Sequence, residues 1–310
     1  MPVYFSILSL IALFGVLGFS ANIVVENIKK IAIHLGIPMF VLGIVLGILT
    51  SFPEFSIAIT ASANNIQAIS IGNLFGGIIV IFCLVLGLGM ILNRKIKTDG
   101  DIMTPLPGFI VMLLPIILGL DGVLNFFDGV LICIGYVAFL VHLYVKNHHI
   151  HDIHATIIKK KFAIAEIFLA IGGTLGIVIS SNLIIHLTTE LLGQSNISPF
   201  IIGLLVFSIG TNLPELTVII TSWKKKLPDI SFSHMLGSAI VNSVILGVMA
   251  ITHPIFLTIN FSYSVIIYFF ILMSILLLYF YKSDRTLSRP EGVVLLLIFV
   301  VFGYIQMLVR

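Results

Sequence analysis

The stretch Ser208-Ile-Gly-Thr-Asn-Leu-Pro-Glu215 places polar groups inside a long apolar run that begins near Pro199. An ionisable side chain at mid-depth of a membrane helix costs about 2.5–3.5 kcal/mol on insertion scales. Pro214 lacks a backbone N–H, so it leaves carbonyl groups in the preceding turn without a helical partner. The stretch therefore predicts an interrupted membrane helix, in which hydroxyl, amide and carbonyl oxygens surround the Glu215 carboxylate and can bind a cation.

The composition around this stretch predicts an integral membrane protein. The chain has 310 residues, of which 59% are hydrophobic and only 9% are charged, whereas soluble domains contain about 25% charged residues. Its apolar runs lack the period-2 alternation of membrane strands. The predicted fold class is therefore all-α, with about ten transmembrane helices, at residues 3–25, 37–62, 67–92, 104–120, 123–145, 162–187, 198–222, 231–252, 258–281 and 291–309.

The basic residues predict how the helices are oriented. If the N-terminus lies outside and the loops alternate, 15 of the 16 Lys and Arg residues fall in inside loops, and only Arg310 lies outside. The positive-inside rule associates such loops with the cytoplasm. We therefore expect a multi-pass protein of the cell membrane with both termini outside.

The sequence also repeats itself. A constant shift along the chain, the repeat shift, aligns the two halves without a gap. It carries Glu54 onto Glu215. Each half would hold five spans, so the second half would enter the membrane from the opposite side. This predicts two inverted-topology repeats, residues 1–146 and 162–310, joined by a cytoplasmic His- and Lys-rich linker at 147–161. The aligned pairs are Ser20 with Ser181, Pro38 with Pro199, Thr50 with Thr211, Pro53 with Pro214, Glu54 with Glu215, and Gly76 with Gly237.

The repeated motifs resemble the α-repeats of the cation/calcium antiporters, which include prokaryotic sodium/calcium exchangers. The first copy, Leu49-Thr-Ser-Phe-Pro-Glu54, is followed by Gly72-Asn-Leu-Phe-Gly-Gly77, and the second copy by Ser233-His-Met-Leu-Gly-Ser-Ala-Ile-Val-Asn242. The resemblance covers nearly the whole chain. It implies that the second, third, seventh and eighth helices enclose the cations, and that the first and sixth slide across this core to expose the site alternately.

The resemblance also implies a set of ligands. Glu54 and Glu215 match the two central carboxylates of the family, and Asn212 stands where the family has Ser. Gly77 replaces an expected Ser and Ile81 an expected Asn or Asp, so the third helix lacks its side-chain ligands. The predicted cation ligands are Glu54, Glu215, Thr50, Ser51, Thr211, Asn212, Ser238 and Asn242.

The chemistry of these groups suits hard cations, because Ca²⁺ prefers six to eight oxygen ligands and no thiolate is present in the set. Two carboxylates balance one divalent ion, or two monovalent ions or protons. We therefore expect a secondary antiporter, not an enzyme, that exchanges Ca²⁺ against Na⁺ or H⁺. The expected partners are inorganic cations and the lipid bilayer, with no cofactor and no nucleic acid. The oligomeric state stays open, a monomer being one option.

Two other functions remain open at this point. The first is a cation-binding membrane protein, sensor or channel that has lost coupled exchange, which the residues at Gly77 and Ile81 favour. The second is an intramembrane enzyme that uses the two Glu residues as acid and base. The spans contain no evident nucleophile, metal-binding His pair or phosphate-binding loop, which speaks against the enzyme.

Several single features have more than one interpretation. The histidines at 148, 149, 151 and 154 can bind a regulatory metal or simply belong to a solvated linker. His234 is either a proton carrier or a packing residue. Asn242 is either a ligand or a hydrogen-bonding link between helices. Asn73 could supply the oxygen that Ile81 lacks, and Gly72-x-x-x-Gly76 indicates close helix packing.

Overall fold

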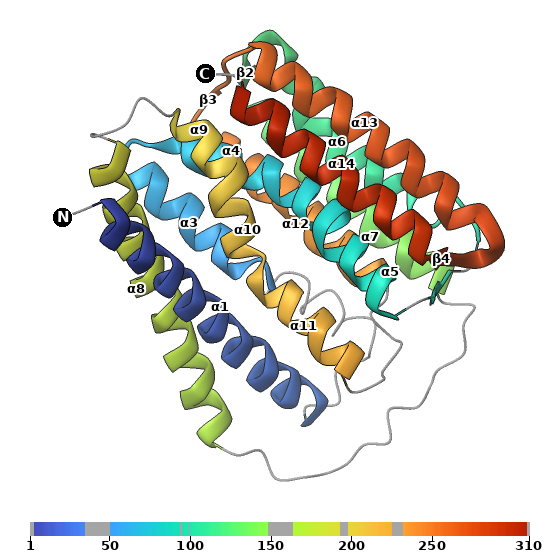
Figure 1. Cartoon of the computed structure of the whole chain (residues 1–310), viewed down its shortest axis with the longest axis horizontal. Coiled ribbons are helices and arrows are strands. Elements are labelled where there is room, and N and C mark those ends of the chain that lie inside the picture. Colours follow the sequence, from blue (N-terminus) through green and yellow to red (C-terminus); the bar gives the residue numbers. More distant parts are fainter. Residues whose placement is uncertain are drawn as a thin grey trace.

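The computed structural model describes residues 3–34, 50–93, 95–98, 100–147, 164–192, 198–224 and 232–308 (Figure 1). Seven helices within these residues are long and apolar enough to cross a membrane, and two shorter apolar helices cover Leu106–Asp121 and Pro199–Thr211. The predicted all-α membrane fold is therefore confirmed. The count of ten spans stays a prediction, since much of the predicted second span, residues 35–49, lies outside the described residues.

The described helices follow most of the predicted spans, but α1 continues to His34, beyond the predicted end of the first span at residue 25. The first half contains α1 (Val3–His34), α3 (Phe52–Ala63), α4 (Gln67–Ile79), the π-helical segment η1 (Val80–Leu86), α5 (Gly87–Asn93), α6 (Leu106–Leu118) and α7 (Phe126–Asn147). The second half contains α8 (Ile164–Leu192), α9 (Pro199–Ile202), the π-helical segment η3 (Gly203–Phe207), α10 (Ser208–Thr211), α11 (Leu213–Lys224), α12 (Phe232–Thr252), α13 (Phe261–Lys282) and α14 (Arg289–Leu308).

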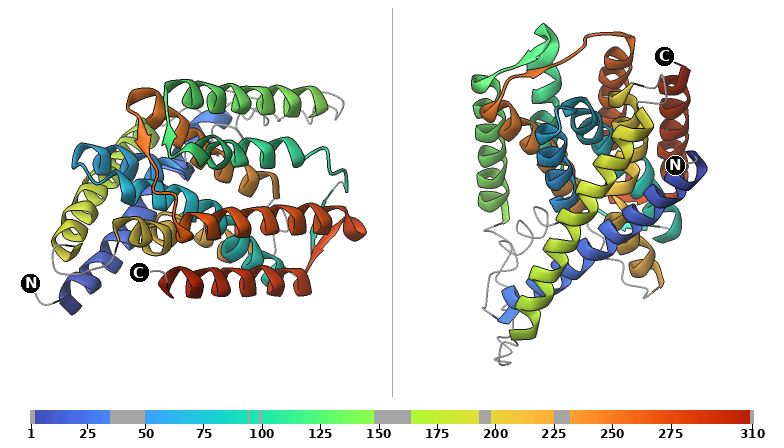
Figure 2. Two further views of the ribbon diagram at one scale, coloured as in Figure 1. Left: turned by 90° about the horizontal axis from the view of Figure 1, so that it is seen from above. Right: turned by 90° about the vertical axis from the view of Figure 1, so that its left-hand side faces the viewer.

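The helices form a buried centre with two flanks. α1 and α8 lie side by side along one edge, and α6, α7, α13 and α14 lie on the opposite side (Figures 1 and 2). Burial separates the centre from the periphery: 83% of the apolar window in Gln67–Asn93 is buried, against 17% in Phe126–Val145. The continuous helix α4–η1–α5 is therefore central, and α7 presents its apolar side chains to the surroundings, as a lipid-facing helix does.

Both predicted helix breaks are present, and their backbones match. Ser51 precedes α3 with φ −88° and ψ 11°, and Asn212 separates α10 from α11 with φ −89° and ψ 14°. These angles lie in the sparsely populated bridge region. Pro53 and Pro214 follow in the first turns of α3 and α11, where the missing N–H is tolerated. The repeat shift carries the first break onto the second.

Glycine brings α4 into backbone contact with the second half. A methyl group at Gly72 would overlap the carbonyl oxygen of Phe200, and one at Gly76 would overlap that of Leu204. The Gly72-x-x-x-Gly76 motif is thus a packing motif, as predicted. It sets the position of α4 against α9 and η3, immediately before the break at Asn212.

Two short β-ribbons connect loops at opposite ends of the helices. β1 (Lys95–Lys97) pairs with β4 (Thr286–Ser288), and β2 (Val123–Leu124) pairs with β3 (Ile255–Phe256). The first ribbon joins two loops that the charge distribution assigns to the inside, and the second joins two loops assigned to the outside. The pairing agrees with alternating loops, whereas which end faces the cytoplasm stays a prediction.

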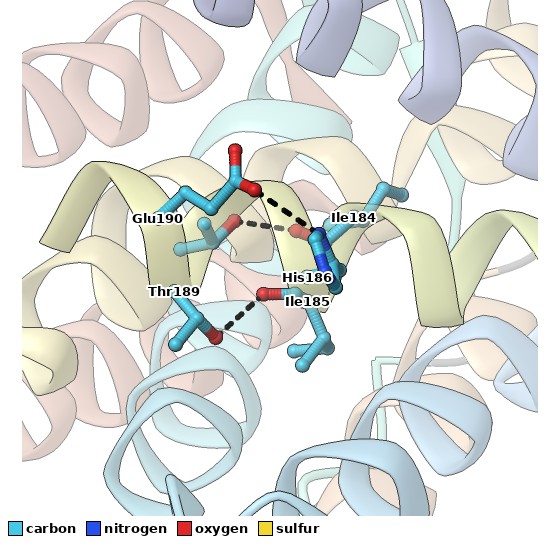
Figure 3. A network of polar contacts seen from close by, with 6 residues as sticks. Ile184, Ile185, His186, Thr189 and Glu190 are labelled. Carbon is cyan, nitrogen blue, oxygen red and sulfur yellow. Dashed lines mark hydrogen bonds and ion pairs between the residues drawn. The ribbon is translucent and has the colours of Figure 1, made fainter. Parts of the chain in front are cut away.

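The last turns of α8 are polar (Figure 3). His186 Nδ1 lies 3.7 Å from Glu190 Oε1, and both side chains are more than half exposed. The Thr189 hydroxyl donates to the Ile185 carbonyl at 2.8 Å. These exposed polar groups lie around residue 187, where the sixth predicted span ends.

Some predicted features lie outside the described residues. They include the histidines of the linker, residues 148–154. The side chain of His234 is likewise not described. The division into repeats and linker therefore stays a prediction.

Candidate cation site

The two helix breaks bring the two carboxylates into the buried centre. Glu54 lies in the first turn of α3 and Glu215 in the first turn of α11, each with only 1% of its surface exposed. The N-terminal end of a helix favours negative charge, because its free N–H groups and its dipole are positive there. The carboxylates are also close enough to repel each other. A cation between them would relieve this repulsion.

Hydrogen bonds cross between the halves and tie each carboxylate to a threonine of the other half. The side chain of Glu54 is hydrogen-bonded to that of Thr211, and the side chain of Glu215 to that of Thr50. Thr50 Oγ1 lies 3.0 Å from Ser238 Oγ. These links explain why the predicted ligands from both motif copies meet at one place.

Four buried oxygens of this cluster have no hydrogen-bond partner within the described part of the chain: Glu54 Oε2, Glu215 Oε2, Asn212 Oδ1 and Asn242 Oδ1. A buried polar atom left unpaired costs about 1–3 kcal/mol and therefore needs an explanation. All four are acceptors, and two belong to carboxylates. A cation would pair them, whereas a purely structural network would be expected to satisfy them internally.

All eight predicted ligands are buried, each with at most 2% exposure. Four of them, Glu54, Glu215, Thr50 and Thr211, are joined by the contacts of the two carboxylates. Two more, Asn212 and Asn242, bring their carboxamides close to Gly77. A Cβ atom at residue 77 would lie 2.5 Å from Asn242 Nδ2 and 3.4 Å from Asn212 Nδ2. Ser238 joins through Thr50, and Ser51 lies at the break of the first half.

The third helix contributes a residue that the ligand prediction left out. Asn73 on α4 is fully buried, and its Oδ1 accepts a hydrogen bond of 3.1 Å from the Thr211 hydroxyl. Its polarity within an apolar span was the signal in the sequence. Ile81, by contrast, lies in η1 within the hydrophobic core. Asn73 therefore does not supply an oxygen at the position of Ile81. It contacts Thr211 from a position one helical turn before Gly77.

Helix α1 covers the break in the second half. The Phe14 ring packs edge-on against Phe207 with ring centroids 5.3 Å apart. A methyl group at Gly210 would overlap the Phe14 ring, and one at Gly18 would lie 3.2 Å from Leu213 Cβ. The site is thus closed on this side by α1.

The donor set is one of hard oxygens. No three His, Cys, Asp or Glu side chains gather within the described ranges, so hydroxyl, carboxamide and carbonyl oxygens would have to complete any coordination shell around the two carboxylates. Such ligands suit Ca²⁺ and Na⁺ better than soft transition metals.

Two broken helices that meet at buried carboxylates, inside a bundle of apolar helices, define the chain as a membrane protein of the ion-transporting class. It belongs to the sodium/calcium exchanger protein family, whose sequence pattern matches residues 5–145 and 165–308. This is a family of membrane antiporters and not of enzymes.

The relatives are distant but match over most of their length. The chain is 27% identical to the uncharacterized membrane protein MJ0091 of Methanocaldococcus jannaschii over 277 residues, covering 88% of each chain. It is 26% identical to the sodium/calcium exchanger MaX1 of Methanosarcina acetivorans over 330 aligned positions, covering 90% of this chain and 91% of the relative.

Solved structures show the same fold. The sodium-calcium exchanger NCX_Mj, soaked with Na⁺ and Sr²⁺, has a TM-score of 0.67 and 25% identity, covering 95% of this chain and 96% of that one. The H⁺/Ca²⁺ exchanger CAX has a TM-score of 0.76 over 98% of this chain and 85% of its own. Its identity is only 12%, so this likeness concerns the fold alone.

Proposed function

We propose that the protein is a secondary antiporter that exchanges Ca²⁺ against Na⁺ or H⁺ by alternating access. The observation that carries this proposal is the set of four unpaired, buried oxygens contributed by both halves of the chain. The names of MaX1 and NCX_Mj support Na⁺ as the counter-ion, and that of CAX brings H⁺ into consideration.

In this proposal, Glu54 and Glu215 neutralise the cation and bind it directly. Thr50, Ser51, Thr211, Asn212, Ser238 and Asn242 complete the oxygen shell with side-chain or backbone oxygens. One divalent ion, or two monovalent ions or protons, balances the two carboxylates. That equivalence allows both substrates of an exchanger to use one site in turn.

Matched contacts support the inverted repeat and alternating access. α1 packs against α10 and α11, and α8 packs against α3. The repeat shift relates α1 to α8 and α3 to α11, so the contact of α1 with α11 corresponds to the contact of α8 with α3. In each half, the first long helix therefore packs against the interrupted helix of the other half. We propose that α1 and α8 move together across this core, in a cell membrane with both termini outside.

The experiment that tests the function is Ca²⁺ uptake into proteoliposomes under an outward Na⁺ gradient, an outward H⁺ gradient, or neither. We expect uptake only when one of the gradients is present, and the effective gradient identifies the counter-ion. Uptake at the same rate without any gradient would indicate a channel. The absence of Ca²⁺ uptake under all three conditions would contradict the proposed substrate.

A substitution at the α1 contact tests alternating access. Gly210→Ala should slow exchange about tenfold, because the added methyl group displaces Phe14 and overpacking of this kind costs about 1–3 kcal/mol. Ca²⁺ affinity should change less than about threefold. The matched control is Gly172→Ala on α8, where no described residue lies within 4 Å. Equal exchange rates in the two variants would remove α1 from the mechanism.

A further inference from the structure

The two threonines of the site have different partners, although their motif copies are related by the repeat. Thr50 is paired with Ser238 of α12, and Thr211 with Asn73 of α4. The repeat shift relates Thr50 to Thr211 and Ser238 to residue 77. Residue 77 is Gly77 and has no side chain, so the partner of Thr211 comes from one helical turn earlier.

We infer that Asn73 is a positioning residue of the cation site, which holds the Thr211 hydroxyl against Glu54 in place of a side chain at residue 77. The inference rests on the proposed function and adds to it a residue outside the predicted ligand set. Ser238 has the corresponding role for Thr50 and Glu215. The site is therefore symmetric in its hydrogen bonds and asymmetric in the residues that make them.

The donor and acceptor inventory explains why a carboxamide fits here. The Thr211 hydroxyl carries one proton, yet its oxygen is bonded to both Asn73 and Glu54. When that proton goes to Asn73 Oδ1, Asn73 Nδ2 has no partner among the described residues. When the amide is turned over, Nδ2 donates to Thr211, and Thr211 donates to the Glu54 carboxylate. In the first arrangement Thr211 has no proton left for Glu54, so their contact requires a protonated Glu54 carboxyl as the donor. Only the turned-over amide lets Thr211 donate to the Glu54 carboxylate.

Packing keeps Asn73 in reach of the break. It lies between Gly72 and Gly76, the residues through which α4 contacts α9 and η3. A Cβ atom at Gly203 would lie 3.0 Å from the Asn73 backbone nitrogen. Because Asn73 is fully buried, solvent does not readily replace its hydrogen bond.

The test measures equilibrium binding of ⁴⁵Ca²⁺ to the purified full chain, and Ca²⁺ exchange in proteoliposomes. Asn73→Ala should raise the half-saturating Ca²⁺ concentration about tenfold, because Thr211 loses the partner that holds its hydroxyl against Glu54. Ser70→Ala is the control, because Ser70 is equally buried on α4 but contacts Met249 outside the site. Its affinity should stay within about twofold of the wild type.

Two further variants separate positioning from a general packing defect. Gly77→Ser combined with Asn73→Ala should restore the affinity to within about threefold of the wild type. The repeat shift relates residue 77 to Ser238, so a serine at 77 can pair with Thr211 as Ser238 pairs with Thr50. The new Cβ atom would lie 2.5 Å from Asn242 Nδ2 and 3.4 Å from Asn212 Nδ2, both at the ends of side chains, so the Asn242 carboxamide has to shift. In a Thr211→Val background, Asn73→Ala should have no further effect, since its partner is already lost.

Unchanged affinity in Asn73→Ala would overturn the inference. So would a loss that Gly77→Ser does not rescue and that persists in the Thr211→Val background, because both results indicate packing alone. If the wild type neither binds nor exchanges Ca²⁺, the proposed function fails instead. The same variants are then compared by ²²Na⁺ binding. The same rescue pattern in Na⁺ affinity would support the positioning role of Asn73, and its absence would reject that role.

Discussion

Glu215→Gln is expected to abolish cation exchange, lowering the rate by about 100-fold or more, while the protein remains folded. Glutamine has the same shape but lacks the charge, and removing the carboxylate that is paired with a buried cation costs about 2–5 kcal/mol. Its amide group would also present N–H donors, which cannot bind a cation. The measurement is gradient-driven ⁴⁵Ca²⁺ uptake, with thermal unfolding of the same preparation.

The matched control is Glu190→Gln on α8. That side chain is 52% exposed and lies beside His186 (Figure 3). The exchange rate of the variant should stay within about twofold of the wild type, since exposed ion pairs contribute little. Native exchange by Glu215→Gln would show that the carboxylate pair does not bind the transported ion.

Gly203→Val is expected to have the second largest effect, on folding itself. A Cβ atom at this position would overlap the Ile69 carbonyl oxygen, so the backbones of α4 and η3 would have to separate. A rigid backbone group cannot yield as a side chain does, and overpacking then costs about 3 kcal/mol or more. We expect the melting temperature of the detergent-solubilised protein to fall by roughly 10 °C, and exchange to be lost.

Gly172→Val on α8 provides the comparison for this prediction. The substitution adds the same side chain to a membrane helix, but no described residue lies within 4 Å of the new Cβ atom. A change of no more than about 2 °C is expected, because the new side chain meets no described neighbour and valine has a higher helix propensity than glycine. Equal melting temperatures for the two variants would show that the glycine contact of α4 does not limit stability.

The two halves differ in what they supply to the site. The second half contributes Ser238 and Asn242, whereas the first has Gly77 and Ile81 at the related positions. The carboxamide of Asn242 lies against Gly77, which has no side chain. We expect this asymmetry to change the number of ions moved per cycle, which is measured as the ratio of counter-ion released to ⁴⁵Ca²⁺ taken up by the proteoliposomes.

The sequence alone determined the fold class, the two helix breaks and the identity of the central carboxylates. These follow from local causes. Long apolar runs must satisfy their backbone polar groups internally and therefore form helices, and a proline limits the helix at a known position. The bridge-region backbone at Ser51 and Asn212 lies directly before the turns that Pro53 and Pro214 define. The repeat shift then related the two breaks to each other.

Only the tertiary structure decided which groups of the two halves meet. The crossed hydrogen bonds of Glu54 with Thr211 and of Glu215 with Thr50, and the recruitment of Asn73, join residues that are far apart in the sequence. Such contacts depend on how closely α4 approaches the second half. That distance is set by glycines whose neighbours are backbone atoms from another part of the chain. The Gly72-x-x-x-Gly76 motif predicts a close contact but not the segment with which it is made.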